Sequence, residues 1–133
     1  MVDAYFSGSV TRISPEAPVP IVNLRNKEQR LGGAANVALN LKSLGAEPII
    51  CSVKGNDADG NILKELCSKE GLLTHALIND YSRRTTVKTR IIGNNHQLLR
   101  VDEEDTEPIE ESVEDLVYEA VKSLITEIDV LIF

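Results

Sequence analysis

Three amphipathic segments, each followed by a short apolar run, constrain the fold of this chain more than any other feature. Apolar residues at helical spacing predict helices from about Gly33 to Leu44, from about Asp57 to Glu70, and along the repeat that begins at Val113. The apolar runs that follow these helices are Pro48 to Val53, His75 to Ile78 and Val130 to Phe133. Continuous apolar strands that alternate with helices are typical of a parallel sheet with helices on both faces, so we predict an α/β fold.

Each predicted helix has one apolar stripe, which we expect to face the core. In the first helix the stripe consists of Ala34, Val37, Ala38, Leu41 and Leu44. In the second helix it consists of Ile62, Leu63, Leu66 and Cys67, and in the third of Val113, Leu116, Val117, Ala120, Val121, Leu124, Ile125 and Ile128. We expect Gly45 and Gly71 to end the first two helices.

Two segments do not fit the alternation of helices and strands. Val19 to Arg30 is extended and half polar, and Thr85 to Asp102 predicts a hairpin around the turn Gly93-Asn94-Asn95-His96. Strands that are polar on both sides are not expected in the core of a parallel sheet. They predict a small second sheet outside the main body, which would serve as a lid or as an interface.

The length of the hairpin loop decides which basic side chains share a face of this second sheet. Lys88 and Arg90 lie on one face of the first strand, because side chains two residues apart point to the same side. A three-residue loop would place Arg90 opposite Arg100, whereas a two- or four-residue loop would place them on opposite faces. The sequence leaves these alternatives open.

Charge limits the partners of this chain. The formal net charge of −7 argues against general nucleic-acid binding, which needs a basic surface. The charges are unevenly distributed, since Tyr81 to Val101 contains no acidic residue and Asp102 to Asp115 contains no basic one. The first stretch is suited to an anionic small molecule. The alternative is a basic hairpin that is balanced by its acidic neighbour.

Hydropathy and cysteine content indicate the cellular location that we expect for this protein. No apolar run approaches the roughly 18 residues of a membrane-spanning helix, and no signal peptide is recognisable at the start of the sequence. Cys51 and Cys67 are too few for a disulfide framework and both fall in apolar surroundings. No Cys/His cluster has metal-ligand spacing. We therefore expect a cytoplasmic protein with reduced cysteines and no membrane partner.

The segment Gly32-Gly33-Ala34-Ala35-Asn36 opens the first predicted helix. Glycines let a ligand approach the backbone, and a helix N-terminus offers unpaired N–H donors. Asn36 adds a donor and an acceptor, which suits a sugar hydroxyl. The alternative is a helix that needs small residues in order to pack closely on a sheet. A dinucleotide site is not expected, because the required glycine spacing after a buried strand is missing.

The spacing beyond this segment resembles the first signature of the ribokinase-like (PfkB) carbohydrate kinases. Six residues separate Ala38 from Gly45, and nine more separate Gly45 from Gly55, which matches the family pattern. The stretch Arg12-Ile13-Ser14-Pro15-Glu16-Ala17-Pro18-Val19-Pro20 is similar to the heptose-7-phosphate kinase branch of that family. Thr86 to Arg90 and Asn95 to Asp102 are also similar to that branch, so the resemblance covers nearly the whole chain.

The resemblance implies a three-layer ribokinase-like fold with a small protruding β lid, formed by strands at about 3–30 and 85–102. It implies transfer of the ATP γ-phosphoryl group, with Mg²⁺, to the anomeric hydroxyl of D-glycero-D-manno-heptose 7-phosphate, on the route to ADP-heptose and the lipopolysaccharide core. By position, Asp3 matches the family's acidic sugar-binding residue, and Gly32, Gly33 and Asn36 match the loop that cradles the sugar. Family members of this kind often dimerise through their lid strands.

The basic residues Lys88, Arg90 and Arg100 fall in the lid by this resemblance. A phosphate on the substrate gives them a physical role, because each can pair with its oxygens. Two positions depart from the family pattern. Leu31 replaces the usual proline before the two glycines, and Ala4 stands where this branch often carries arginine.

The family's catalytic aspartate and its glycine-rich anion hole would lie downstream of this sequence. We therefore interpret residues 1–133 as the N-terminal, substrate-side part of one kinase domain, without its ATP-binding part, and expect this chain alone to be inactive. The alternatives are another ribokinase-like kinase, for fructose, ribose or a nucleoside, or a non-catalytic binding or dimerisation module.

Overall fold

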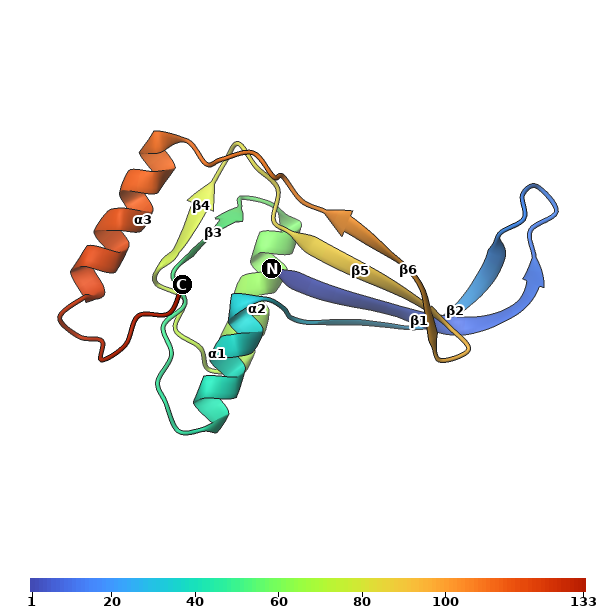
Figure 1. Cartoon of the computed structure of the whole chain (residues 1–133), viewed down its shortest axis with the longest axis horizontal. Coiled ribbons are helices and arrows are strands. Elements are labelled where there is room, and N and C mark those ends of the chain that lie inside the picture. Colours follow the sequence, from blue (N-terminus) through green and yellow to red (C-terminus); the bar gives the residue numbers. More distant parts are fainter.

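The computed structural model describes residues 1–133 and contains six strands and three helices (Figure 1). The strands are β1 (Val2–Ile13), β2 (Pro20–Leu31), β3 (Ser52–Gly55), β4 (Leu77–Asp80), β5 (Val87–Gly93) and β6 (His96–Glu103). The helices are α1 (Ala34–Ser43), α2 (Ala58–Lys69) and α3 (Glu111–Leu124). None of the helices has the length and apolar character that a membrane crossing requires.

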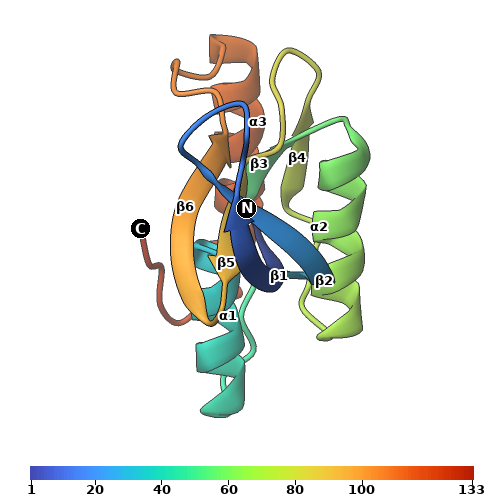
Figure 2. The ribbon, with the colours of Figure 1, turned by 90° about the vertical axis from the view of Figure 1, so that its right-hand side faces the viewer.

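Four strands form a mixed sheet in the order β2-β1-β5-β6, which we call the lid sheet. The β1–β2 and β5–β6 pairs are antiparallel, whereas the central β1–β5 pair is parallel. The lid sheet extends away from the helices, and the β1–β2 ribbon reaches farthest (Figures 1 and 2). The two segments that did not fit the alternation of helices and strands therefore lie in one sheet, in which β1 joins them.

The lid sheet is anchored in the core at the beginning of its two central strands. Val2 and Ala4 of β1 and Val87 of β5 are buried, together with Leu63 and Cys67 of α2. All five belong to a single hydrophobic cluster. Burial of such side chains is worth roughly 1.5–3 kcal/mol each for the larger ones. The near end of the sheet is thus part of the body, while its far end projects.

The body contains the second sheet, in which β3 and β4 pair in parallel. Helix α3 lies on one side of this pair and α1 and α2 lie on the other (Figure 1). The α/β class is therefore confirmed. The strands begin later than the apolar runs suggested, so that His75 lies in the turn before β4 and Ile49 makes only an isolated bridge to Leu73.

The third predicted strand is absent. Val130 to Phe133 has no strand partner, and Val130 and Ile132 are 73% and 61% exposed. The prediction was wrong here because an apolar run becomes a strand only where a neighbouring strand edge supplies its hydrogen bonds. β3 and β4 pair with each other, and neither pairs with this run.

The predicted apolar stripe is confirmed for α2, but for α1 it is right only at the buried Ala38 and the half-buried Leu41. In α1 the buried residues are Ala35 and Ala38, whereas Val37 and Leu44 are exposed. Both buried residues of α1 belong to the hydrophobic core cluster, so the small side chains of this helix face the core. In α3 only Val113 is fully buried.

The β5–β6 hairpin settles the relation between Arg90 and Arg100 in a way that loop length alone did not predict. The turn has two residues, Asn94 and Asn95, both with positive φ (50° and 66°). A bulge at Leu98 then shifts the register by one residue. Arg90 consequently lies directly opposite Arg100, although a two-residue loop without a bulge would have put them on opposite faces.

A partly buried hydrogen-bond cluster joins the base of the lid sheet to α2. Asp57, the N-cap of α2, accepts from the backbone N–H of Gly60 at 2.7 Å. It also accepts from the backbone N–H and the hydroxyl of Thr85, each at 2.7 Å. The same hydroxyl accepts from the N–H of Gly55 at 2.9 Å. One carboxylate thus caps a helix and fixes the residue that leads into β5.

The Asp57 cluster generates a stability prediction. Burial by itself raises the pKa of Asp57, but the hydrogen bonds from Thr85 and Gly60 outweigh it and the net pKa is lowered. We expect Asp57→Ala to reduce the free energy of unfolding by about 2 kcal/mol, through loss of a cap and of charge-assisted hydrogen bonds. Asp59→Ala, which removes the next carboxylate without these bonds, should change it by less than about 0.5 kcal/mol. Urea denaturation measures both.

The sign of the pH dependence follows from the lowered pKa. The stability that Asp57 contributes is present above the pKa of the unfolded chain, near 4, and is lost as the pH falls through the lower folded value. Asp57→Ala should therefore show a weaker loss of stability on acidification than the parent chain. Equal acid sensitivity in the two proteins would contradict the assignment.

Candidate functional site

The centre of the candidate site is the carboxylate of Asp3, near the beginning of β1. Its Oδ1 accepts from Nη1 of Arg90 at 2.6 Å, and the two side chains are only 15% and 21% exposed. Its Oδ2 lies against the backbone of Gly32, so that a Cβ on that residue would come within 2.6 Å of this oxygen. The structure therefore brings three predicted residues, Asp3, Gly32 and Arg90, into contact.

The two glycines are needed for different reasons. At position 32 a side chain would collide with the Asp3 carboxylate, which occupies that space. Gly33 has a positive φ of 55° and forms the N-cap of α1, a conformation that strains other residues. No side chain caps α1, and Asn36 is exposed in its first turn. The helix N-terminus, which no side chain caps, thus begins one residue after the glycine that touches the Asp3 carboxylate.

Lys88 and Arg100 lie on the same sheet face but have acidic partners of their own. Nζ of Lys88 is 2.8 Å from carboxylate oxygens of both Asp102 and Glu104. Arg100 binds Asp102 through two hydrogen bonds, of 2.7 and 2.9 Å. Hydrogen bonds from Arg100 and then Lys88 lower the pKa of Asp102, and the bonds to Asp102 and Glu104 raise the pKa of Lys88. Without a ligand, the cations Lys88 and Arg100 are therefore paired with carboxylates of the acidic segment that begins at Asp102.

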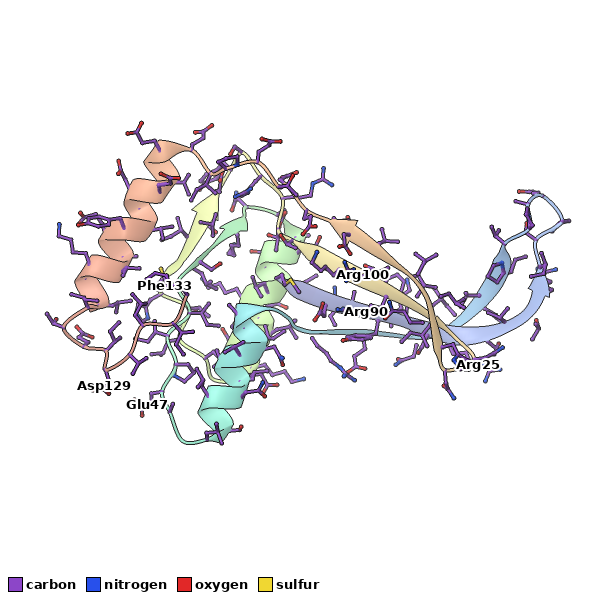
Figure 3. All side chains as sticks on the ribbon, in the orientation of Figure 1. Arg25, Glu47, Arg90, Arg100, Asp129 and Phe133 are labelled. Atoms are coloured by element: carbon purple, nitrogen blue, oxygen red, sulfur yellow. The ribbon has the colours of Figure 1, made fainter.

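Strand register explains why these residues share one face. Lys88 lies beside Asp3 in the parallel β1–β5 pair and opposite Asp102 in the hairpin. Arg90 occupies the next position on that face and lies opposite Arg100. Figure 3 shows Arg90 and Arg100 close together on the lid sheet, near its junction with the helices. The four charged residues predicted for the lid and β1 thus form one continuous polar surface.

Sequence reasoning missed a second group on this face. The Tyr5 ring lies 5.2 Å from the Arg90 guanidinium and 5.0 Å from that of Arg30 on β2. Glu28 holds Arg30 with two hydrogen bonds, of 2.6 and 2.9 Å. The sequence did show that Asp3 and Tyr5 share one face of their strand, and that Glu28 and Arg30 share one face of theirs. It did not show that these two faces are the same, because that depends on the register between β1 and β2.

A polar cleft and a small apolar cavity do not include the predicted site residues. The polar cleft, of about 420 Å³, is lined by Asp80, Ser82, Arg83, Glu104, Asp105, Thr106, Glu107 and Pro108. The apolar cavity, of about 20 Å³, lies behind α1, between Met1 and Leu63. None of the predicted site residues Asp3, Gly32, Gly33, Asn36, Lys88, Arg90 and Arg100 lines either of them. No group of three His, Cys, Asp or Glu side chains is arranged to hold a metal ion.

Comparison with known proteins gives a consistent relationship. The model of the pfkB family carbohydrate kinases matches residues 4–131. The chain is 48% identical over 109 residues to a D-beta-D-heptose 7-phosphate kinase from Bordetella bronchiseptica, which covers 81% of this chain and 34% of the relative. It is 46% identical over 114 residues to the bifunctional protein HldE from Pelobacter propionicus, which covers 86% of this chain and 23% of the relative.

Solved structures agree on the fold. A carbohydrate kinase from Agrobacterium tumefaciens superposes with a TM-score of 0.60 at 23% identity, and covers 76% of this chain and 32% of the other. The ribokinase-like architecture expected from the sequence is thereby confirmed. The chain spans about a third or less of the length of the curated relatives described above.

The contact between Gly32 and Asp3 generates a prediction. We expect Gly32→Ala to reduce the free energy of unfolding by about 1–3 kcal/mol, because the new methyl group overlaps the Asp3 carboxylate. The loss should shrink in an Asp3→Ala background, where the overlap is gone. Gly45→Ala, at a positive φ but with no atom within 4 Å, is the control for backbone strain alone. Equal losses with and without Asp3 would contradict the assignment.

Proposed function

This chain belongs to the pfkB family of carbohydrate kinases, and we propose that it is the substrate-binding part of a kinase for D-glycero-D-manno-heptose 7-phosphate. The observation that carries the proposal is the 48% identity to a D-beta-D-heptose 7-phosphate kinase. The geometry supports it, because the Asp3 carboxylate, the glycine pair and the cationic lid residues lie side by side. The reaction would phosphorylate the anomeric hydroxyl and feed ADP-heptose and lipopolysaccharide core synthesis.

The sugar-binding side of the proposed site is Asp3 with the start of α1. A carboxylate accepts hydrogen bonds from sugar hydroxyls, and Oδ2 of Asp3 has no hydrogen-bond partner within the chain. Gly32 and Gly33 keep side chains out of this space, and the Asn36 amide can both donate and accept. These four residues would orient the heptose ring.

The phosphate-binding side is formed by Lys88, Arg90 and Arg100. Charge-assisted hydrogen bonds from such groups to phosphate oxygens are strong, and a dianionic phosphate can compete with the carboxylates that hold the cations in this structure. Asp102 and Glu104 would then act as exchangeable partners that keep the cations in place before the substrate arrives. This gives the charged face of the lid sheet a role in selecting a phosphorylated sugar.

ATP and Mg²⁺ would be bound by residues outside this chain. The described residues contain no carboxylate or histidine cluster suited to a metal ion. The family resemblance places the catalytic aspartate and the glycine-rich anion hole downstream. Phosphoryl transfer depends mainly on positioning and charge stabilisation, so half of a site should give essentially no turnover. We propose that this chain is one part of a longer enzyme.

Two alternatives remain distinguishable from this proposal. Another ribokinase-like kinase, for fructose, ribose or a nucleoside, would act on a substrate without a phosphate and would have no use for three cations on the lid. A non-catalytic binding module would bind sugar but never turn it over. The basic lid favours the phosphorylated heptose over the first alternative.

We further propose a homodimer formed through the opposite, apolar face of the lid sheet. Phe6, Ile91 and Leu99 form one cross-strand row on that face, and Thr89 and Val101 continue it toward the body. Leu99 and Val101 are 50% and 46% exposed. Contiguous exposed apolar residues on a sheet are typical of interfaces. A cytoplasmic location would suit the free thiols of Cys51 and Cys67.

The function is tested with the full-length product of the gene. We expect ATP-dependent phosphorylation of D-glycero-D-manno-heptose 7-phosphate, with fructose, ribose and nucleosides turned over at least 100-fold less efficiently in kcat/KM. Arg100→Ala should raise KM for the phosphorylated heptose about tenfold, since a charge-assisted contact is worth roughly 1.5–3 kcal/mol. The 133-residue chain alone should show no turnover. Turnover by that chain, or a preference for an unphosphorylated sugar, would overturn the proposal.

The dimer is tested by sedimentation. We expect the parent protein to sediment as a dimer and Leu99→Glu to sediment as a monomer, because a charge would be buried in the apolar interface. Leu44→Glu, at the 84% exposed C-cap position of α1, is the matched control and should stay dimeric. A parent protein that is monomeric at micromolar concentration would exclude this interface.

A further inference from the structure

We propose that Arg90 is a positioning residue for Asp3, and that it thereby sets the affinity for the sugar itself as well as for any phosphate the sugar carries. This inference rests on the proposed function, since it assumes that Asp3 binds sugar hydroxyls. The inference gives Arg90 a role that Lys88 and Arg100 do not have. The acidic partners of those two residues lie on β6 or immediately after it, and not in the sugar-binding part of the site.

The first argument is that the two carboxylate oxygens of Asp3 make different contacts. Oδ1 is held by Nη1 of Arg90 at 2.6 Å, and Oδ2 is free of hydrogen bonds and packed against Gly32. A carboxylate that is fixed through one oxygen and walled by backbone on the other side has little freedom to rotate. Its free lone pairs then point in a set direction, so that less entropy is lost when a hydroxyl binds.

The second argument is that Arg90 is itself held in place. Its guanidinium lies 5.2 Å from the centre of the Tyr5 ring, and Arg30 lies 5.0 Å from the same ring. Glu28 fixes Arg30 through two hydrogen bonds. A chain of contacts therefore runs across β2, β1 and β5 and ends on Asp3. Such support is what a precisely oriented binding group requires.

The third argument is the contrast between two arginines that lie opposite each other. Arg100 uses Nε and Nη2 on both oxygens of Asp102. Arg90 donates only through Nη1, to Asp3 and, at a long 3.5 Å, to the Lys88 carbonyl. Its Nε and Nη2 therefore remain available. A single Arg90 guanidinium can thus hold Asp3 and still offer two donor nitrogens to an anion. It would couple recognition of the hydroxyl to recognition of the phosphate.

The test uses calorimetric binding of two probes to the full-length gene product: D-glycero-D-manno-heptose 7-phosphate and the same heptose without phosphate. We expect Arg90→Gln to weaken binding of the unphosphorylated heptose about tenfold. Asp3→Asn should weaken it at least as much, and Arg90→Gln should add less than twofold in the Asp3→Asn background, because the two residues act as a unit. Arg25→Gln removes the same charge elsewhere on the lid sheet and is the matched control.

The outcomes are distinguishable. If Arg90→Gln weakens only the binding of the 7-phosphate, the positioning role is overturned and the proposed function stands. If the parent protein binds neither probe, the proposed function fails and the inference fails with it. Should Arg90→Gln unfold, Arg90→Lys carries the test, since it keeps the charge but loses the fork that holds Asp3. A loss of threefold or more for the unphosphorylated heptose is then expected, and parent-like affinity would overturn the inference.

Discussion

The parallel pairing of β1 with β5 is the constraint on which the rest of this structure depends. Both strands begin in the hydrophobic core, where Val2 and Val87 are paired and buried, and both leave it in the same direction. One register therefore connects the packing of the body to the polar face of the lid sheet. It places Lys88 beside Asp3 and Arg90 beside Tyr5. The Asp57–Thr85 cluster holds the residues that lead into β5, so the register is fixed at its origin.

The polar face of the lid sheet balances its charges locally. Arg90 and Arg100 are directly opposite, an arrangement that destabilises a strand pair unless each charge is compensated. Asp3 compensates one and Asp102 the other, and the two acids come from different strands. The pairs are partly exposed, so their net contribution to folding is small compared with core burial. Their value lies in keeping four charged groups ordered within a small area.

Local patterns predicted much of this architecture. The period of α2, its start near Asp57 and its end near Gly71 were readable because periodicity and helix-ending glycines are local properties. The contact between Gly32 and Asp3 was not, because it joins residues far apart in sequence and depends on where β1 pairs. The apolar stripe of α1 was partly wrong for a similar reason, since Ala35 is buried and Val37 is exposed, and only the whole fold defines where the core lies. The run from Val130 to Phe133 shows that apolar composition alone does not make a strand.

The extra residue at Leu98 has a consequence for how such a hairpin can evolve. A substitution there leaves the chain length, and with it the facing of Arg100, unchanged. Deleting the codon for Leu98 itself would remove the bulge and leave Arg100 opposite Arg90, because the residues on either side keep their partners. Deleting the codon for Val101 would also allow a regular ladder, but Leu99 would then lie opposite Arg90, and Arg100 would move to the other face. An apolar side chain would replace a charge on the polar face in one genetic event. In this hairpin, ligand chemistry is encoded in length as well as in residue type.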